Sequence, residues 1–284
     1  MTSILVGIDG STRGEKALEW AARLAERNQA QLALLAVVSP EVKRVAASDD
    51  VVKDAVDTAL GTARAYVEGN YPDLEVTTAT ATGDIVEALV NASENNDMVV
   101  MGSHHTTTLG EKVWGAKGLR VSVSTTVPTA VVPSDWTEGY EGRGIVVGVG
   151  PDDVSAAAVD LGVRVALATK QPIELVSAWG VPALLSGPAK VMGGGLAPVG
   201  VDFQRKLDAI VASCKEKHPE LDICGNAIEG PAPTQVLLEH AQGKSLLVLG
   251  THARSMVSRA LFGSVTYGAL ARLAVPTIIV PTNE

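Results

Sequence analysis

The feature that most constrains this chain is that its sequence repeats. The apolar segment Ile4–Ile8 (ILVGI) recurs as Ile145–Val149 (IVVGV), and Val127–Pro133 (VPTAVVP) recurs as Val275–Pro281 (VPTIIVP). The matching segments lie at the beginning and the end of each copy, so two copies of one fold account for nearly all of the 284 residues. A chain of this length also suits about two domains, each able to bury its own core.

The repeats set the expected domain boundaries. We expect a first domain over residues 1–134, a linker over 135–144 and a second domain over 145–284. The linker contains glycine and polar residues, as connecting segments usually do. Matching segments near the end of the two copies lie further apart in the sequence than matching segments near their start. This difference indicates a net insertion in the first part of the second copy. Residues 187–200, with three consecutive glycines, are the expected place.

Within the first copy, short apolar runs alternate with segments of helical periodicity. Ile4–Ile8 is a continuous apolar run, as expected for a strand buried on both faces. Thr12–Glu15 has the pattern of a capping box and predicts the start of a helix. The whole pattern predicts strands over 4–8, 32–38, 74–81, 98–101 and 129–132, with helices from 12, over 48–68, over 84–95 and from about 115.

This alternation of strands and helices predicts the fold class. Helical crossovers between strands imply a parallel sheet covered on both faces. We therefore expect two doubly wound α/β domains of flavodoxin-like type, each a five-stranded, mostly parallel sheet that binds ligands at the carboxyl ends of its strands. The closing strands Thr129–Val132 and Thr277–Val280 are apolar and would be exposed as free edges, so we expect them to pair with each other within the chain.

Composition and charge exclude several classes of protein. Apolar residues make up 46% and charged residues 19% of the chain, which excludes an intrinsically disordered protein. The net charge of -9 argues against nucleic acid or an anionic membrane surface as a partner. The two cysteines, Cys214 and Cys224, indicate neither a disulfide framework nor a metal site. Without a membrane-spanning run or a signal peptide pattern, a cytoplasmic location is expected.

Two segments at the expected strand ends carry the candidate ligand chemistry. Asp9 follows the first strand, where its carboxylate could bind a ribose or a phosphate-bound metal, or could serve the cap of the next helix. The second segment is the loop after the fourth strand, where glycines let backbone N–H groups approach a phosphate and a helix begins. In the second copy this loop runs from Gly250 to Ser264, whose hydroxyl is a further donor.

These residues resemble the signature of the universal stress protein family, Gly-x2-Gly-x9-Gly-(Ser/Thr), combined with an Asp that ends the first strand. The resemblance extends over both copies and includes residues 5–11 (LVGIDGS), 82–89 (TGDIVEAL) and 99–103 (VVMGS). It implies adenine nucleotide-binding folds related to adenine nucleotide α-hydrolases, with ATP or AMP as ligand and Mg²⁺ accompanying ATP. It also implies that adenine lies against the second strand, that the glycine loop holds the phosphates and that the last strand forms a dimer edge. The implied site residues are Asp9, Gly10, Val37, Val38, Gly102 and Gly115 in the first copy, and Gly250, His252, Ala253, Gly263, Ser264 and Val265 in the second.

Each copy departs from the signature at a different place. The first copy keeps the strand-end Asp but has His105 for the second glycine and Ala116 for the Ser/Thr. The second copy keeps Gly263 and Ser264 but has Gly150 where the Asp would stand. Trp179 ends the second strand of the second copy, where it could stack on a base or fill the pocket.

The expected function is a stress-response regulator that binds an adenine nucleotide weakly or in one domain only, with the phosphates expected in the second copy, whose glycine loop is the better preserved. It would act as a sensor or scaffold, because no catalytic arrangement of nucleophile, base or metal ligands is visible in the sequence. The alternative is a nucleotide-free interaction and dimerisation module with two degenerate pockets. A third reading is a binder of another small molecule, with Trp179 and the insertion at 187–200 near its ligand. We also expect two such chains to form a homodimer.

Overall fold

The computed structural model describes most of the chain. The described residues are 2–103, 116–137, 142–150, 155–179, 197–230, 232–251 and 264–282, without the side chains of 116, 197–199 and 264.

Each half alternates strands with helices, as the sequence predicts. The first half comprises β1 (Ser3–Ile8), α1 (Thr12–Asn28), β2 (Gln31–Val38), α2 (Pro40–Val45), α3 (Asp49–Asn70), β3 (Val76–Thr82), α4 (Ile85–Ser93), β4 (Met98–Gly102), α5 (Ala116–Ser124) and β5 (Thr129–Val132). The second half comprises β6 (Ile145–Gly148), α6 (Ala156–Thr169), β7 (Ile173–Trp179), α7 (Ala197–Lys217), β8 (Ile223–Glu229), α8 (Pro233–Ala241), β9 (Leu246–Thr251), α9 (Ser264–Ala271) and β10 (Thr277–Pro281).

Two local predictions differ from the structure. The residue that caps α1 is Ser11, whose Oγ accepts a hydrogen bond from the Gly14 N–H at 3.2 Å, so the cap lies one residue before the predicted Thr12. Pro40 ends β2 as expected, but it also begins the short helix α2, because proline fits the first turn of a helix where no N–H is needed.

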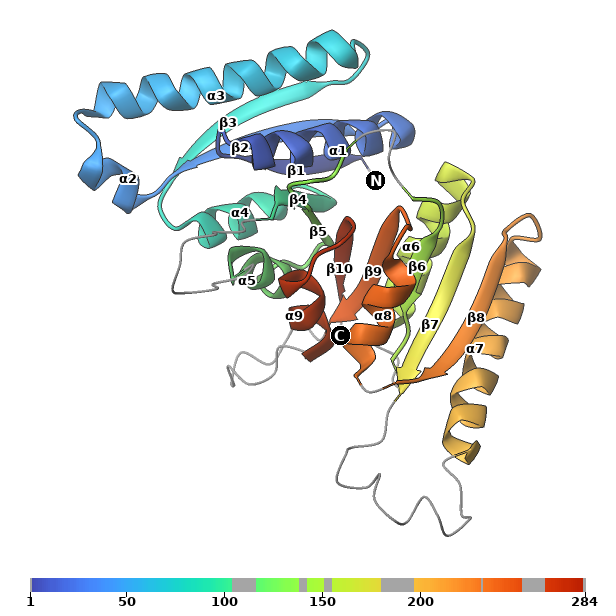
Figure 1. Cartoon of the computed structure of the whole chain (residues 1–284). Helices are drawn as coiled ribbons and strands as arrows, with labels where there is room; N and C mark the ends of the chain where they lie inside the picture. The colour runs from blue at the N-terminus through green and yellow to red at the C-terminus, as the bar shows by residue number, and fades with distance from the viewer. Residues whose placement is uncertain are drawn as a thin grey trace.

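The ten strands form one continuous sheet in the order β3-β2-β1-β4-β5-β10-β9-β6-β7-β8 (Figure 1). Strands within each half are parallel, which confirms the doubly wound class, although the order 3-2-1-4-5 differs from the 2-1-3-4-5 of flavodoxin. The closing strands β5 and β10 pair antiparallel, with Ala130 opposite Ile278. The expected pairing of the two closing strands within the chain is therefore confirmed.

The sheet separates two apolar cores, and each core runs through both halves. Helices α1, α3, α6 and α7 cover one face, over side chains such as Ile4, Leu34 and Ile278. Helices α4, α5, α8 and α9 cover the other face, over side chains such as Val99 and Ile279. Because neighbouring residues of a strand point to opposite faces, the register decides which strand-end side chain meets which helix layer.

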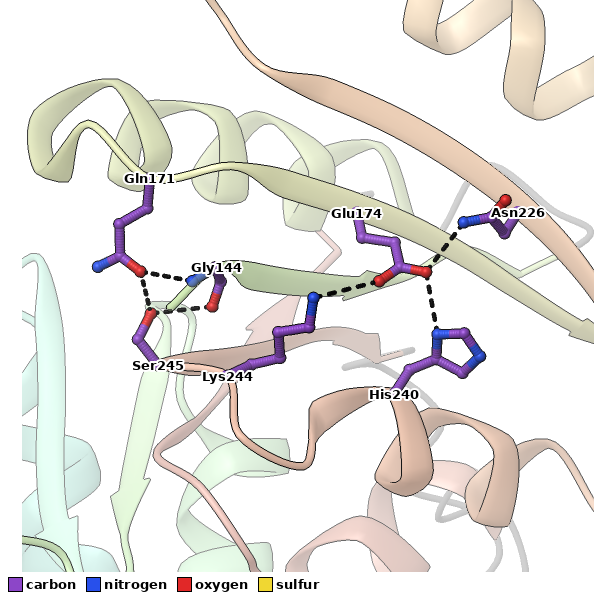
Figure 2. Close-up of polar contacts among 7 residues, drawn as sticks. All are labelled: Gly144, Gln171, Glu174, Asn226, His240, Lys244 and Ser245. Carbon is purple, nitrogen blue, oxygen red and sulfur yellow. Dashed lines mark hydrogen bonds and ion pairs between the residues drawn. The ribbon is translucent and has the colours of Figure 1, made fainter. Parts of the chain in front are cut away.

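The two halves start their first strands with related contacts. In the second half, the Ser245 N–H donates to the Gly144 carbonyl at 2.9 Å. Ser245 Oγ lies 2.9 Å from the same carbonyl oxygen and 2.7 Å from Gln171 Oε1, which also accepts the Gly144 N–H (Figure 2). In the first half, the Asp97 N–H donates to the Ser3 carbonyl at 2.9 Å. These bonds join the amino ends of the strands, opposite the expected ligand end.

Candidate functional site

At the carboxyl end of β1, Asp9 organises the start of α1. Its Oδ1 accepts a hydrogen bond from the Ser11 backbone N–H at 3.0 Å and from the Ser11 hydroxyl at 2.6 Å. Ser11 Oγ in turn accepts from the Gly14 N–H. Asp9 is itself exposed, so it supports the helix cap and still presents a carboxylate at the strand end.

A small cavity beside Asp9 brings several of the predicted residues together. It has a volume of about 70 Å³ and opens on the face that α4 and α5 cover. Asp9, Val37 and Gly102 line it together with Arg13 and with Lys117 from the first turn of α5. A carboxylate, two cations and apolar side chains therefore meet at the ends of β1, β2 and β4.

Gly10 and Val38 lie outside this cavity. Val38 is buried and, by strand alternation, points to the opposite face from Val37. Gly10 has a φ of +71°, which glycine adopts without strain, and lines a different cavity between α1 and α3. The structure thus brings together Asp9, Val37 and Gly102 from the predicted first-copy set.

Gly102 is required by packing. A Cβ atom at this position would lie 2.6 Å from the Arg13 carbonyl oxygen in the first turn of α1. That oxygen belongs to backbone, which cannot move aside cheaply. The close approach of β4 to α1 therefore explains a glycine here independently of any phosphate.

Ser103 is a residue that the sequence reasoning did not single out. It follows β4 directly, it is 6% exposed, and its Oγ has no hydrogen-bond partner among the described residues. A buried hydroxyl without a partner is uncommon and costs free energy. Its signal in the sequence is the repeat itself, since Thr251 carries a hydroxyl at the matching position of the second copy.

The second half builds its strand ends differently. The Gly150 N–H donates to Ser155 Oγ at 2.7 Å, so a serine hydroxyl closes the end of β6 where the first half has Asp9. At the end of β7, the Trp179 indole stacks on Phe203 of α7, with ring centroids 6.5 Å apart and planes 9° apart. Trp179 therefore packs toward α7, on the opposite face from α8 and α9.

Other candidates of the second copy are only partly placed. Gly250 lies in β9, while Ser264 and Val265 form the start of α9. His252, Ala253 and Gly263 lie outside the described residues, as does Gly115 of the first copy.

Two observations on the described residues concern metal ligands and thiols. Those residues contain no group of three or more His, Cys, Asp or Glu side chains that could hold a metal ion. Burial raises the pKa of the Cys214 and Cys224 thiols, which keeps both in the unreactive neutral form. None of the described helices is long and apolar enough to cross a membrane.

Comparisons with known proteins agree with this architecture. Over 98% of its length the chain is 26% identical to a universal stress protein of Mycolicibacterium smegmatis, 96% of which is covered. Its identity to a universal stress protein of Mycobacterium tuberculosis is 25%, over 97% of this chain and 96% of the relative. The crystal structure of a universal stress protein from Archaeoglobus fulgidus matches 99% of the fold with a TM-score of 0.75, at 15% identity and 97% coverage of that chain. The universal stress protein family model matches residues 1–133 and again 143–281, so the chain belongs to this family as a tandem of two copies.

Proposed function

We propose that the first half binds an adenine nucleotide, AMP or ATP, and that the chain acts as a regulatory sensor or scaffold in the stress response. The observation that carries this proposal is the convergence of Asp9, Val37 and Gly102 on one cavity at the strand ends. Doubly wound folds bind ligands at this place, where the strand order reverses between β1 and β4.

The cavity offers a partner for each part of a nucleotide. Leu35, Val37 and Leu89 give an apolar wall for the base. Asp9 would accept a hydrogen bond from a ribose hydroxyl, and Arg13 and Lys117 would face the phosphates. Mg²⁺ accompanying ATP would be held by the phosphates and the Asp9 carboxylate, which is the hard oxygen ligand that this ion prefers.

Weak affinity follows from the size of the cavity. Ligand pockets commonly measure about 300–1,000 Å³, whereas this one measures about 70 Å³. Nucleotide binding must therefore widen it, and the free energy of that rearrangement is subtracted from the affinity. A site of such low affinity is occupied only at a high nucleotide concentration, as a sensor of nucleotide level requires.

We favour a sensor over a turnover enzyme because the carboxylate that lines the cavity already forms hydrogen bonds within the protein. Asp9 is the carboxylate of the cavity, and its Oδ1 already accepts two hydrogen bonds from Ser11. A general base has to lie within hydrogen-bond reach of the attacking water, and these bonds hold Oδ1 in the cap of α1. Any hydrolysis of ATP would accordingly be slow.

The second candidate function is a nucleotide-free interaction module, and the second half favours it. There Gly150 stands where the first half has Asp9, and its N–H is hydrogen-bonded to Ser155 Oγ. If both halves behave in this way, the chain works through its surfaces and as a homodimer of tandem chains.

The test begins with protein purified without added nucleotide. Heat denaturation followed by mass spectrometry identifies any released nucleotide and its moles per chain. Calorimetric titration with AMP and ATP then measures the affinity. We expect micromolar to millimolar binding to one site per chain, weakened by Asp9→Asn and by Lys117→Gln. Flat titrations at millimolar ligand would favour the interaction module.

A further inference from the structure

A larger cavity lies on the opposite face of the first half, between α1 and α3. Its volume is about 700 Å³, and it begins at the end of β1 beside Ile8 and Gly10. Leu18 and Ala63 form part of its apolar floor, and Tyr66 lies at its far end. The volume falls in the range of about 300–1,000 Å³ that is common for small-molecule sites.

The second half has a cavity at the equivalent place. It lies between α6 and α7, begins beside Val149 and Gly150, and measures about 560 Å³. Because two copies with different side chains both leave this space, the cavity belongs to the fold and is not a local gap in one helix pair.

The charges that line the two cavities differ. The first is lined by Glu15, Glu19 and Asp54, with Asp9 at its mouth, and none of its described lining residues is a Lys or Arg. The second is lined by Asp160 together with two lysines, Lys206 and Lys217. The described lining of the cavity is therefore acidic in the first half, whereas lysines outnumber carboxylates in the second half.

The acidic groups of the first cavity are only partly neutralised. Glu19 forms an ion pair with Lys16 at 2.8 Å. Glu15 and Asp54 take part in no ion pair within the described residues. Glu15 and Asp54 are both exposed, so they give the rim of the cavity a negative potential while its floor stays apolar.

From this combination we propose that the α1–α3 cavity binds an organic cation with an apolar body. The ammonium or guanidinium group contacts Glu15 and Asp54, and the body packs against Leu18 and Ala63. The proposal does not rest on nucleotide binding, since the small cavity lined by Val37 lies on the other face of the sheet.

The test uses three probes with one indole body. Tryptamine carries an ammonium group, tryptophol is its neutral analogue, and indole-3-propionate is an anion. Titration of each probe into the full chain, followed by calorimetry or ligand-observed NMR, gives the affinities. We expect tryptamine to bind, and the other two probes to bind at least about tenfold more weakly, because charge-assisted contacts are lost.

A matched pair of variants locates the site. Thr62 and Ala209 are exposed residues of α3 and α7 that line the first and second cavity, respectively. Thr62→Trp should abolish tryptamine binding by filling the first cavity, and Ala209→Trp should leave it unchanged. The double variant Glu15→Gln, Asp54→Asn should weaken binding about tenfold.

Three outcomes would overturn the proposal. They are no tryptamine binding at millimolar concentration, equal binding of tryptophol, and loss of binding in Ala209→Trp but not in Thr62→Trp. Failure of AMP binding alone would overturn the proposed nucleotide site and leave this one standing.

Discussion

The two halves share one scaffold but end their strands with different chemistry. In the first half the exposed carboxylate of Asp9 stands at the end of β1, and Val37 lines a cavity beside it. In the second half the Gly150 N–H is bonded to Ser155 Oγ at the end of β6, and Gly150 stands where the first half has Asp9. At these described strand ends the sheet and helices repeat, but the polar groups that they present differ.

A second difference lies toward the amino ends of the strands. In the second half, Glu174 Oε1 accepts hydrogen bonds at 2.9 Å from Asn226 Nδ2 and from His240 Nδ1, and Oε2 lies 3.5 Å from Lys244 Nζ (Figure 2). The strand register places Ala33 at the corresponding position of the first half. The Glu174 side chain is 14% exposed, and a carboxylate this buried requires its full set of donors.

The largest effect is expected from Gly102→Ala. The new Cβ would clash with the Arg13 carbonyl oxygen, so we expect a loss of about 2–4 kcal/mol in the free energy of unfolding, measured by chemical denaturation. Gly61→Ala is the control, because nothing lies within 4 Å of its Cβ position in the interior of α3. That variant should gain about 0.5–1 kcal/mol. Equal stabilities of the two variants would contradict the close approach of β4 to α1.

Glu174→Ala should have the next largest effect. It leaves His240, Lys244 and Asn226 without their shared acceptor, and we expect a loss of about 2–3 kcal/mol in unfolding free energy. The conservative Glu174→Gln should retain part of this stability, because its side-chain oxygen still accepts hydrogen bonds. If Glu174→Ala lowers the free energy of unfolding no more than an exposed surface substitution does, the contacts of Glu174 with Asn226, His240 and Lys244 do not stabilise the second half.

The same comparison predicts a difference in acid sensitivity. Hydrogen bonds from the Thr2 N–H and hydroxyl hold the pKa of Asp97 below its usual value of 3.8, whereas the second half uses the uncharged Ser245 at the corresponding place. A lowered folded-state pKa contributes stability above pH 3.8 that is lost as the pH falls through the folded-state value.

Asp97→Asn tests this smallest effect. The variant should lower stability at neutral pH by less than about 1 kcal/mol, because the group is exposed and screened, and it should flatten the loss of stability below pH 3.8. Ser245→Ala should lower stability without changing the pH dependence. Identical pH profiles for Asp97→Asn and the parent chain would refute the assignment.

Much of the fold could be predicted because it follows from the local pattern of apolar residues along the chain. Continuous apolar runs marked the buried strands, and the apolar closing segments predicted the β5–β10 pairing, because such edges need a partner. The predicted boundaries of strands were less accurate where a turn determines the first residue of the strand. Leu74 was expected in a strand, but its N–H donates to the Tyr71 carbonyl in the turn before β3.

The candidate site was predictable only in part, because its final form depends on contacts between distant segments. The family signature pointed to Asp9 and Gly102, but not to Ser103, whose hydroxyl has no hydrogen-bond partner among the described residues. Strand alternation puts Val37 and Val38 on opposite faces of the sheet, but which of the two lines the cavity follows only from the packing of the helices. The stacking of Trp179 on Phe203 joins β7 to α7, and no local sequence pattern gives it.

The central claim is our proposal that the nucleotide site lies in the first half and not in the second. Calorimetric titration of AMP into Val37→Phe and the matched Ala178→Phe tests it most directly, because the two positions correspond in β2 and β7. We predict that Val37→Phe fills the cavity beside Asp9 and abolishes binding, while Ala178→Phe binds AMP as the parent chain does. Loss of binding in Ala178→Phe with full binding in Val37→Phe would contradict the account.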